Sequence, residues 1–277
     1  MTATLADTNT LSEAQFRAIS TLVKSICGID LHDGKRELVK ARLAKRIRLL
    51  RLRTFDDYIR FVRDDTSGNE LTSMLDSLST NLTFFFRESA HFEFLRSHAL
   101  ARMIEQRRAR GRLRMWSAGC STGEEPYSLA MLLLEYFPEL QGWDVRILAT
   151  DLSTRVLAQA REGVYDAPRV RQVPPALAEK YFVPDARRER FRVRDEVRAA
   201  VSFARLNLIE SWPMQGPFDL IFCRNVMIYF DKPTQETLVR RFHGLLSPGG
   251  LLMVGHSESL TGIEHSFHYV RPAVYQK

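Results

Sequence analysis

The chain has 277 residues, of which 45% are hydrophobic and 26% are charged. Both fractions are typical of a globular protein and exclude a collagen-like or wholly disordered chain. At roughly 150 residues per domain, this length predicts about two domains. The formal net charge is +7, and the longest apolar runs, such as 130–134, are much shorter than the ~20 residues that a membrane span requires.

The N-terminus and the cysteines predict a cytoplasmic location. No Lys or Arg precedes Arg17 and no apolar stretch precedes it, so a signal peptide is not expected. Cys27, Cys120 and Cys223 are odd in number and far apart, which predicts neither a disulfide framework nor a zinc spacing. The histidines, His256 among them, are also scattered. We therefore expect a reducing compartment and no bound metal.

The first 80 residues predict a small helical bundle. Residues 1–10 are expected to form a flexible tail. The pattern of residues 12–15 is a capping box that begins a helix, and Gly28 is expected to end that helix. Further helices are expected over 33–52, from Thr54 onwards and around 71–78, and no strand is expected before residue 112. Short helices with short connections predict an all-α domain over 11–80.

Positive charge is concentrated in this predicted domain. Residues 35–63 contain eleven Lys or Arg but only three acidic residues. A local excess of this size favours an acidic partner for the N-terminal region. Nucleic acid and an acidic protein surface both meet that requirement, and a solvated basic face is the alternative.

From residue 112 onwards, strands and helices alternate. Strands are expected over 112–116, 145–151, 219–225 and 251–255, with helices over 124–137, 153–161 and 233–246. This alternation predicts a parallel, doubly wound sheet with helices on both faces. Its ligands are expected at the carboxyl ends of the strands.

Two segments interrupt the alternation. Residues 162–200 contain four prolines and a strictly alternating stretch at 190–194, which together predict a small inserted antiparallel β-subdomain at about 165–200. Residues 267–276 predict a closing hairpin. The expected fold is therefore an α/β, Rossmann-like domain over 99–277, preceded by the all-α domain and by a linker over 81–98.

The loop at 117–125 joins an expected strand to an expected helix. Its small residues allow the backbone to approach a ligand closely. No Lys follows Gly123, which excludes a Walker phosphate loop, and the full G-x-G-x-x-G pattern is absent too. Glu124 and Glu125 at the helix start favour a ligand with amine or hydroxyl groups, although acids there also serve as ordinary partners of the helix dipole.

Polar residues follow other strands at the same edge of the sheet. Asp151 ends a strand, where an acid can accept hydrogen bonds from ribose hydroxyls. Alternatively, or in addition, it caps the helix at Ser153. With the loop, Asp151 favours a nucleoside ligand. Asn225 and the pair Asn207-Leu208 are placed similarly, either to contact that ligand or to face solvent.

The linker contains the segment 81–88, NLTFFFRE. Three adjacent aromatic residues cannot all face one core. Either the segment is a hydrophobic hinge between the domains, or Asn81, Thr83 and Arg87 reach the ligand site while the aromatic rings pack around it.

Several motifs together closely resemble the bacterial chemotaxis receptor methyltransferases, the CheR-type protein-glutamate O-methyltransferases. The matching segments follow one another along nearly the whole chain: NLTFFFRE at 81–88, WSAGCSTGEEPYS at 116–128, ATD at 149–151, IFCRNVMIYFD at 221–231 and GHSE at 255–258. The resemblance implies an S-adenosylmethionine-dependent methyltransferase domain behind a receptor-docking helical domain. The implied cofactor contacts are Asn81, Thr83, Arg87, Glu124 or Glu125, Asp151, Asn207, Leu208, Asn225 and Val226.

The implied reaction needs little acid–base chemistry. A glutamate side chain, with a reference pKa near 4.3, is ionised at neutral pH, and the sulfonium methyl group is already electrophilic. The protein therefore has to position the reactants and remove water from the carboxylate. Tyr229 is expected to contact the reacting carboxylate or the methyl region, unless it only packs at its turn. Arg87 is expected to orient an acidic substrate as well as the cofactor.

The resemblance also implies a partner. The basic residues are expected to dock on the acidic cytoplasmic helices of chemoreceptors, so that a monomer that is not itself a membrane protein works at membrane-bound receptor arrays. The residues expected to dock are Arg42, Arg46, Arg48, Arg51 and Arg53. The stretch 183–191 is short and contains no Gly, which argues against tethering to a C-terminal receptor pentapeptide.

Two rival functions share the fold and the cofactor. A nucleic-acid methyltransferase suits the basic region, but Val226-Met227-Ile228-Tyr229 follows Asn225 instead of the Pro-Pro-Tyr run of base methyltransferases. Residues 35–53 also contain no aromatic side chain on which a base could stack, so we expect no nucleic-acid partner. A non-catalytic cofactor-binding sensor would have lost a cofactor residue, and none is missing.

Overall fold

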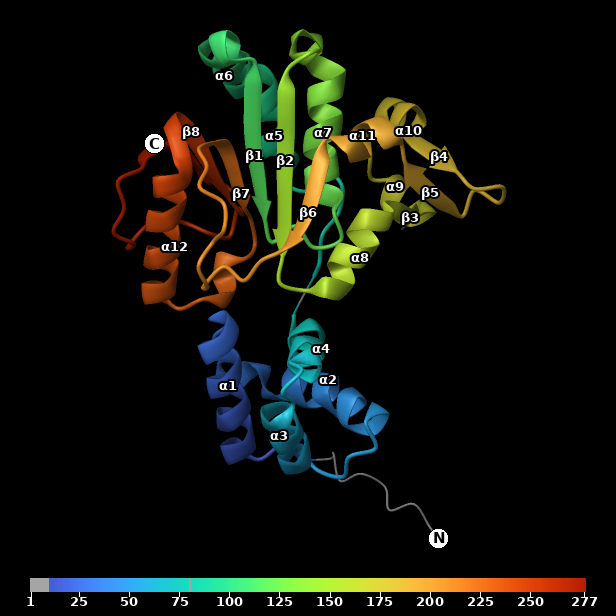
Figure 1. Cartoon of the computed structure of the whole chain (residues 1–277), viewed down its shortest axis with the longest axis vertical. Coiled ribbons are helices and arrows are strands. Elements are labelled where there is room, and N and C mark those ends of the chain that lie inside the picture. Colours follow the sequence, from blue (N-terminus) through green and yellow to red (C-terminus); the bar gives the residue numbers. More distant parts are fainter. Residues whose placement is uncertain (1–9, 80) are drawn as a thin grey trace. The chain divides into compact units, whose positions relative to one another are not determined.

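The structure is a computed structural model that describes residues 10–79 and 81–277. The expected tail at 1–10 therefore lies, except for Thr10, outside the described residues. The chain divides into two compact units. The first contains Met1–Thr80 together with Tyr229–Asp231, and the second contains Asn81–Ile228 and Lys232–Lys277 (Figure 1).

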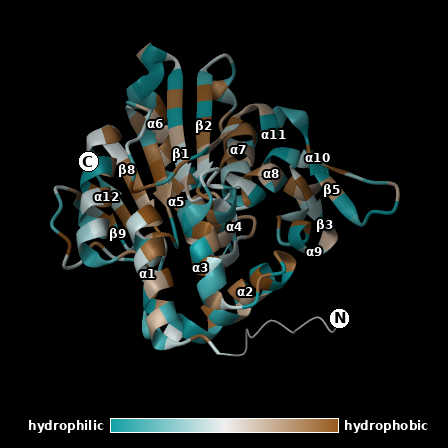
Figure 2. Cartoon of the chain, turned by 60° about the horizontal axis from the view of Figure 1, so that its bottom comes forward, coloured by the Kyte–Doolittle hydropathy of each residue, from teal (hydrophilic) through white to brown (hydrophobic). Residues whose placement is uncertain are grey.

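The first unit is built from amphipathic helices. These are α1 (Glu13–Cys27), α2 (Arg36–Leu49), α3 (Phe55–Asp64) and α4 (Asn69–Leu78), and Figure 2 shows hydrophobic and hydrophilic residues sharing each of α1 and α3. The expected capping box begins α1, because the Ser12 side chain accepts from the Gln15 N–H and the Gln15 side chain accepts from the Ser12 N–H. Gly28 ends the helix with a φ of 74°. The all-α prediction for this part of the chain is confirmed.

Helix α2 is shorter than predicted. The expected helix over 33–52 begins with a 3₁₀ turn (η1, Asp33–Lys35), and α2 itself ends at Leu49. Arg51 takes a left-handed φ of 56°, while the Leu52 N–H donates to the Ile47 carbonyl and the Arg51 N–H to the Arg48 carbonyl. These bonds form a Schellman motif, in which glycine is the usual left-handed residue. Because an arginine takes that position here, the sequence contains no visible stop signal.

The second unit is organised around a seven-stranded sheet in the order β6-β2-β1-β7-β8-β10-β9. The pairs β6·β2, β2·β1, β1·β7 and β7·β8 are parallel, and β10 pairs antiparallel with both β8 and β9. From β1 the strands are added on one side as β2 and then β6, and the next strand, β7, pairs with the opposite edge of β1. The switch point of the sheet therefore lies between β1 and β7. The bounds are β1 (Arg112–Ala118), β2 (Asp144–Asp151), β6 (Val201–Arg205), β7 (Phe218–Cys223), β8 (Leu246–Val254), β9 (His268–Arg271) and β10 (Val274–Gln276).

Helices pack on both faces of this sheet, because alternate residues of each strand point to opposite sides. Met115 of β1 and Phe222 of β7 belong to the core shared with α7. On the other face, Trp116 packs against Trp212 and against Phe242 of α12.

The helices of this unit are α5 (Ser89–Phe94), a π-helical turn η2 (Leu95–Ala99), α6 (Leu100–Arg107), α7 (Glu124–Tyr136), α8 (Thr154–Glu162), α11 (Asp195–Ala199) and α12 (Lys232–Leu245). Short 3₁₀ turns are η3 (Arg108–Arg110), η4 (Pro138–Leu140) and η5 (Met227–Tyr229).

The expected insertion forms a small antiparallel sheet in the order β3-β5-β4. Its parts are β3 (Val164–Asp166), α9 (Ala167–Val170), α10 (Pro175–Tyr181), β4 (Phe182–Pro184) and β5 (Arg190–Val193). The predicted fold class, a parallel Rossmann-like core with an inserted antiparallel subdomain, is therefore confirmed.

Two strand boundaries differ from the predictions. Strand β7 ends at Cys223 rather than at Asn225, because Asn225 takes a left-handed φ of 58° that an extended strand does not allow. Strand β8 begins at Leu246, five residues before the predicted 251. The prediction was late because the glycines at 249 and 250 are not typical strand residues.

A search of the described residues for a membrane-crossing helix, judged by length and apolar character, finds none.

Candidate active site

The loop after β1 requires its glycines for two reasons. Gly119 and Gly123 have φ values of 81° and 96°, in the left-handed region that favours glycine. A Cβ atom at Gly119 would also lie only 2.4 Å from Cγ2 of Val226. The Gly119 and Cys120 N–H groups donate to the Thr150 carbonyl at 2.8 and 2.9 Å. The loop is thus held between the end of β2 and the turn that follows β7.

Asp151 supports this loop from the end of β2. Its Oδ2 accepts from the Ser121 N–H at 2.8 Å, and its Oδ1 accepts from the Ser153 N–H at 2.9 Å. Helix α8 is capped by Ser153, whose Oγ accepts from the Val156 N–H, so the alternative role of Asp151 as the helix cap is not what the structure shows. The Asp151 carboxylate therefore joins the glycine loop to the turn that precedes α8.

Each acid at the start of α7 is paired with an arginine. Glu124 is fully buried and accepts from Arg169 at 2.5 Å and from Thr122 Oγ1 at 2.6 Å. Glu125 accepts from Ser117 Oγ at 2.7 Å and from Arg224 at 2.9 Å. Burial raises the pKa of both carboxyl groups, and the paired arginines oppose the rise. Glu125 keeps 12% of its side chain exposed, whereas Glu124 keeps none.

Arg224 connects the linker to α7, a role that the sequence analysis missed. Its side chain is 1% exposed and forms ion pairs with Glu88 at 3.1 Å and Glu125 at 2.9 Å. It also donates to the backbone carbonyl of Arg87. A buried charge is costly unless it is paired, and here two carboxylates supply the partners. The available signal was a charged residue placed directly after the apolar run 220–223.

Glu258 shapes the turn after β7 and was also missed. Its carboxylate accepts backbone N–H bonds from Asn225 (2.7 Å), Val226 (2.9 Å), Ile228 (3.2 Å) and Gly255 (2.6 Å). Burial raises the pKa of Glu258, and these four donors oppose the rise. The carboxylate thus fixes the backbone of Asn225 and Val226, the two residues of this turn that the resemblance implies as cofactor contacts.

The aromatic residues of the linker diverge, as the sequence required. Phe85 is buried and its ring lies 4.9 Å from that of Tyr165 in an edge-to-face contact, whereas Phe86 meets Phe92 at 5.2 Å. The rings of Phe85 and Phe86 therefore anchor the segment within the second unit.

One polar linker residue, Asn81, lies close to the glycine loop. The Ser121 hydroxyl donates to the Asn81 carbonyl at 3.0 Å. The Asn81 Nδ2 is buried and has no hydrogen-bond partner among residues 10–79 and 81–277. Buried donors are normally paired, so this amide is free for an acceptor atom of a ligand. Thr83 is half-buried, and the Arg87 guanidinium donates to the Leu82 carbonyl at 2.6 Å.

The remaining predicted residues fall into two groups. Asn207 and Leu208 are buried directly after β6, and the Asn207 amide donates to Glu210 at 2.9 Å. Tyr229 belongs to the first unit, where the Lys35 ammonium lies 5.2 Å from the centre of its ring. The geometry of the second unit therefore brings together the linker, the glycine loop, Asp151 and the 225–226 turn, but it does not include Tyr229.

These residues fit S-adenosylmethionine. The close approach at Gly119 forms a cradle that any larger residue would fill, and the unpartnered Asn81 amide offers a donor. The carboxylates of Asp151 and Glu125 suit the hydroxyl, ammonium and sulfonium groups of such a ligand. When bound, this cofactor supplies an electrophilic methyl group.

The basic residues of the first unit serve two different purposes. Arg46 forms an ion pair with Glu70, which is 6% exposed and also accepts from the Tyr58 hydroxyl at 2.7 Å. Arg42 donates to the Leu78 and Ser79 carbonyls at the end of α4. Both arginines are therefore parts of the helical bundle. The exposed members of the predicted docking set are Arg48, Arg51 and Arg53.

Comparison with known proteins agrees with this geometry. The sequence profile described as "CheR methyltransferase, SAM binding domain" matches residues 81–275, and "CheR methyltransferase, all-alpha domain" matches residues 14–79. The chemotaxis protein methyltransferase of Escherichia coli K12 is 43% identical over 269 residues, covering 96% of this chain and 91% of the relative. The Klebsiella aerogenes protein of the same description is 44% identical over 96% of this chain and 90% of its own. A probable chemotaxis protein methyltransferase of Rhizobium etli is 43% identical over 92% and 96%. The chain therefore belongs to the CheR methyltransferase family.

Proposed function

We propose that this protein transfers the methyl group of S-adenosylmethionine to glutamate side chains on the cytoplasmic domains of chemoreceptors. The products are glutamate methyl esters and S-adenosylhomocysteine, formed for adaptation in chemotaxis. The observation that carries the proposal is the meeting of the glycine loop, Asp151 and the 225–226 turn at the carboxyl edge of the sheet, where its switch point lies. The relatives named chemotaxis protein methyltransferases support the choice of pathway.

We assign the cofactor site to residues of the second unit. Asp151 accepts the ribose hydroxyls, and the Asn81 amide donates to an acceptor on the cofactor. Glu125 is the acid that faces the cofactor, because it keeps part of its side chain exposed, while the fully buried Glu124 holds Arg169. The other proposed contacts are Thr83, Arg87, Asn207, Leu208, Asn225 and Val226.

The chain's contribution to the transfer is positional. A substrate carboxylate oxygen attacks the methyl carbon, a C–O bond forms, and the C–S bond breaks with its electron pair returning to sulfur. No proton has to move, because the attacking glutamate is already ionised at neutral pH. Alignment and the exclusion of water therefore provide the rate enhancement. Arg87 orients the substrate carboxylate, and Tyr229 contacts the reacting groups from η5.

Receptor recognition is assigned to the exposed arginines of the first unit. Arg48, Arg51 and Arg53 present three positive charges close together in the sequence, which favours an acidic receptor helix. The β4–β5 connection at 185–189 is short and contains no Gly, so the proposal is a cytoplasmic monomer that acts on receptors directly, without a pentapeptide tether.

The test is a transfer assay with S-adenosylmethionine labelled in its methyl group. A chemoreceptor cytoplasmic fragment and bulk RNA are offered in parallel. Label on the receptor that mild base releases as methanol is expected, because carboxyl methyl esters hydrolyse readily. Base-stable label on RNA would establish the nucleic-acid rival instead. Cofactor binding by calorimetry without transfer to the receptor would favour the non-catalytic sensor.

The assignment of Tyr229 is tested in the same assay. Tyr229→Phe removes the hydroxyl and keeps the ring, so a fall in kcat of at least about tenfold is expected if the hydroxyl acts on the reacting groups. Tyr269→Phe, at an exposed position of β9, is the matched control. Full turnover by Tyr229→Phe would show that the residue only packs.

A further inference from the structure

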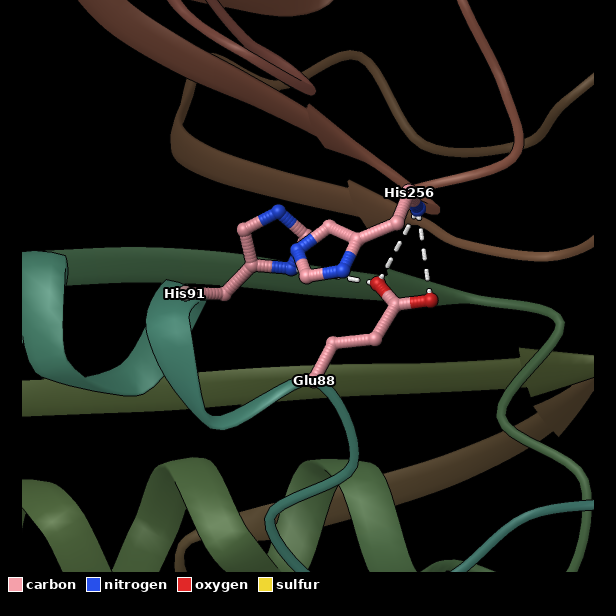
Figure 3. A group of neighbouring side chains, drawn as sticks. All are labelled: Glu88, His91 and His256. Atoms are coloured by element: carbon pink, nitrogen blue, oxygen red, sulfur yellow. Dashed lines mark hydrogen bonds and ion pairs between the residues drawn. The ribbon is translucent and has the colours of Figure 1, made fainter.

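Glu88, His91 and His256 form a cluster that the methyl-transfer mechanism does not use. Glu88 ends the linker, His91 lies in α5, and His256 follows β8, so the fold brings together residues that are far apart in sequence (Figure 3). One possible ligand atom from each lies within 4.8 Å of the others. The His91 Nδ1 is 3.5 Å from Glu88 Oε2, and the two imidazole centres are 4.8 Å apart.

His91 is the unusual member of this cluster. Its side chain is 2% exposed, and neither ring nitrogen has a hydrogen-bond partner in the described part of the chain. Buried polar groups are almost always paired, so this imidazole lacks the partner that its burial calls for. Because both ring nitrogens are buried and unpartnered, this imidazole has a nitrogen available for a metal ion.

Glu88 and His256 are arranged around that ring. Both Glu88 carboxylate oxygens lie 3.2 Å from the backbone nitrogen of His256, which donates to them. This contact fixes the carboxylate beside the His256 ring, as Figure 3 shows. The His256 side chain is exposed, so it can rotate about its side-chain bonds to close the cluster without disturbing the core.

The surrounding charges permit a cation. Arg224 brings one positive charge to the cluster through its ion pair with Glu88, but it is also paired with Glu125. Arg271 also acts electrostatically on His91, so the carboxylates of Glu88 and Glu125 balance the two guanidinium groups. The Glu88 carboxylate supplies the negative charge next to a bound divalent ion, and the attraction between them is favourable.

We propose that Glu88, His91 and His256 form a binding site for a divalent transition metal ion of the zinc class. Two imidazoles and one carboxylate are a ligand set of zinc sites that keep an open position for water. Imidazole ligands favour zinc and its neighbours over magnesium and calcium, which prefer oxygen ligands. Tetrahedral ligands at about 2 Å from zinc lie about 3.3 Å apart, so modest side-chain rotation completes the site.

Such an ion would connect two parts of the proposed cofactor site. Glu88 directly follows Arg87, and His256 lies two residues before Glu258, which holds the 225–226 turn. Binding to the folded chain alone would also raise its thermal stability by mass action. The inference goes beyond methyl transfer, and its test does not depend on activity.

The test is a titration of the full-length, untagged, metal-free protein with zinc chloride, followed by calorimetry. One ion per chain is expected, with a Kd that weakens at least tenfold in His256→Ala. His268→Ala removes another exposed histidine, on β9, and is expected to bind as the unmodified chain does. His91→Gln is a second ligand variant, with circular dichroism confirming that each variant is folded.

Cobalt(II) provides a spectroscopic readout of the same site. Its visible absorption bands on binding are expected in the unmodified chain and in His268→Ala, and they are expected to disappear in His256→Ala. Magnesium chloride in excess is expected not to displace zinc. The proposal is overturned if zinc binding is not saturable, if His256→Ala binds zinc as tightly as the unmodified chain, or if magnesium competes equally.

Discussion

The carboxylate of Glu258 lies 2.7 Å from the backbone nitrogen of Asn225 and accepts its hydrogen bond. Asn225 has a left-handed φ of 58°, a conformation in which asparagine is enriched among residues other than glycine. The bond holds the backbone in that conformation. A carboxylate after one strand thereby sets the backbone after the neighbouring strand, where the proposed cofactor contacts lie.

Glu258→Gln should weaken binding of S-adenosylmethionine at least tenfold. The amide keeps the size of the side chain, but its NH₂ group cannot accept from the backbone donors that the carboxylate oxygens now serve. Unpaired buried donors cost about 1–3 kcal/mol each, so the turn should relax. Calorimetric titration with the cofactor measures the effect. Glu264→Gln, at an exposed position, is the control, and equal Kd values for the two variants would show that Glu258 does not position the turn.

Gly119→Ala should abolish measurable cofactor binding at concentrations that saturate the unmodified chain. The new Cβ would lie 2.4 Å from Cγ2 of Val226, so either the loop or the 225–226 turn must move. Gly142→Ala is a matched control, because Gly142 has a similar φ of 84° but no heavy atom within 4 Å of the new Cβ. Both variants should lose roughly 1 kcal/mol of stability from the left-handed conformation. A similar loss of cofactor binding in both would assign the effect to backbone strain alone.

Arg46→Ala should lower the free energy of unfolding of the first unit by about 2–4 kcal/mol. Its removal leaves the buried Glu70 without its charge partner, and breaking a buried pair is strongly destabilising. Arg48→Ala, an exposed change on the same helix, should stay within about 0.5 kcal/mol. Urea unfolding followed by circular dichroism measures both. Similar values would mean that the Arg46–Glu70 pair contributes little.

Reversal of Arg48, Arg51 and Arg53 to Glu should reduce receptor methylation and leave cofactor binding intact. The three side chains are exposed, unlike Arg42 and Arg46, which hold the helical bundle together. The fall in kcat/KM should be largest at low salt, because salt screens interactions between exposed charges. Reversal of Arg102, Arg108 and Arg110, which are also exposed, changes the net charge equally. An equal fall in that control would indicate a non-specific charge effect.

Thiol alkylation should be slow in the native chain and complete in urea. Burial raises the pKa of Cys27 to about 11 and holds those of Cys120 and Cys223 well above the usual value. At pH 8, which is below each of these values, the thiols stay protonated, and the thiolate is the reactive form. Iodoacetamide labelling followed by mass spectrometry checks this. Rapid modification of native Cys120 would contradict a packing role for the thiol in the cofactor loop.

Local patterns predicted most of the secondary structure. The capping box at Ser12, the glycine after α1 and the alternation of strands and helices each reflect interactions within a few residues. The end of α2 was not visible, because Arg51 takes the left-handed position where glycine normally signals a stop. The start of β8 was hidden by glycines for a related reason: their low strand propensity concealed a pairing that the neighbouring strand enforces.

The sequence by itself determined the family, the fold class and the placement of Gly119, Asp151 and Asn225 at the carboxyl edge of one sheet. These follow from ordered motifs and from hydrophobic periodicity, which a chain carries locally. Only the tertiary structure decided that Arg46 supports the bundle while Arg48 remains exposed, that Arg224 and Glu258 hold the site, and that His91 meets His256. Such contacts join residues up to 168 positions apart and leave no periodic trace, because they depend on how the packed elements bring side chains together.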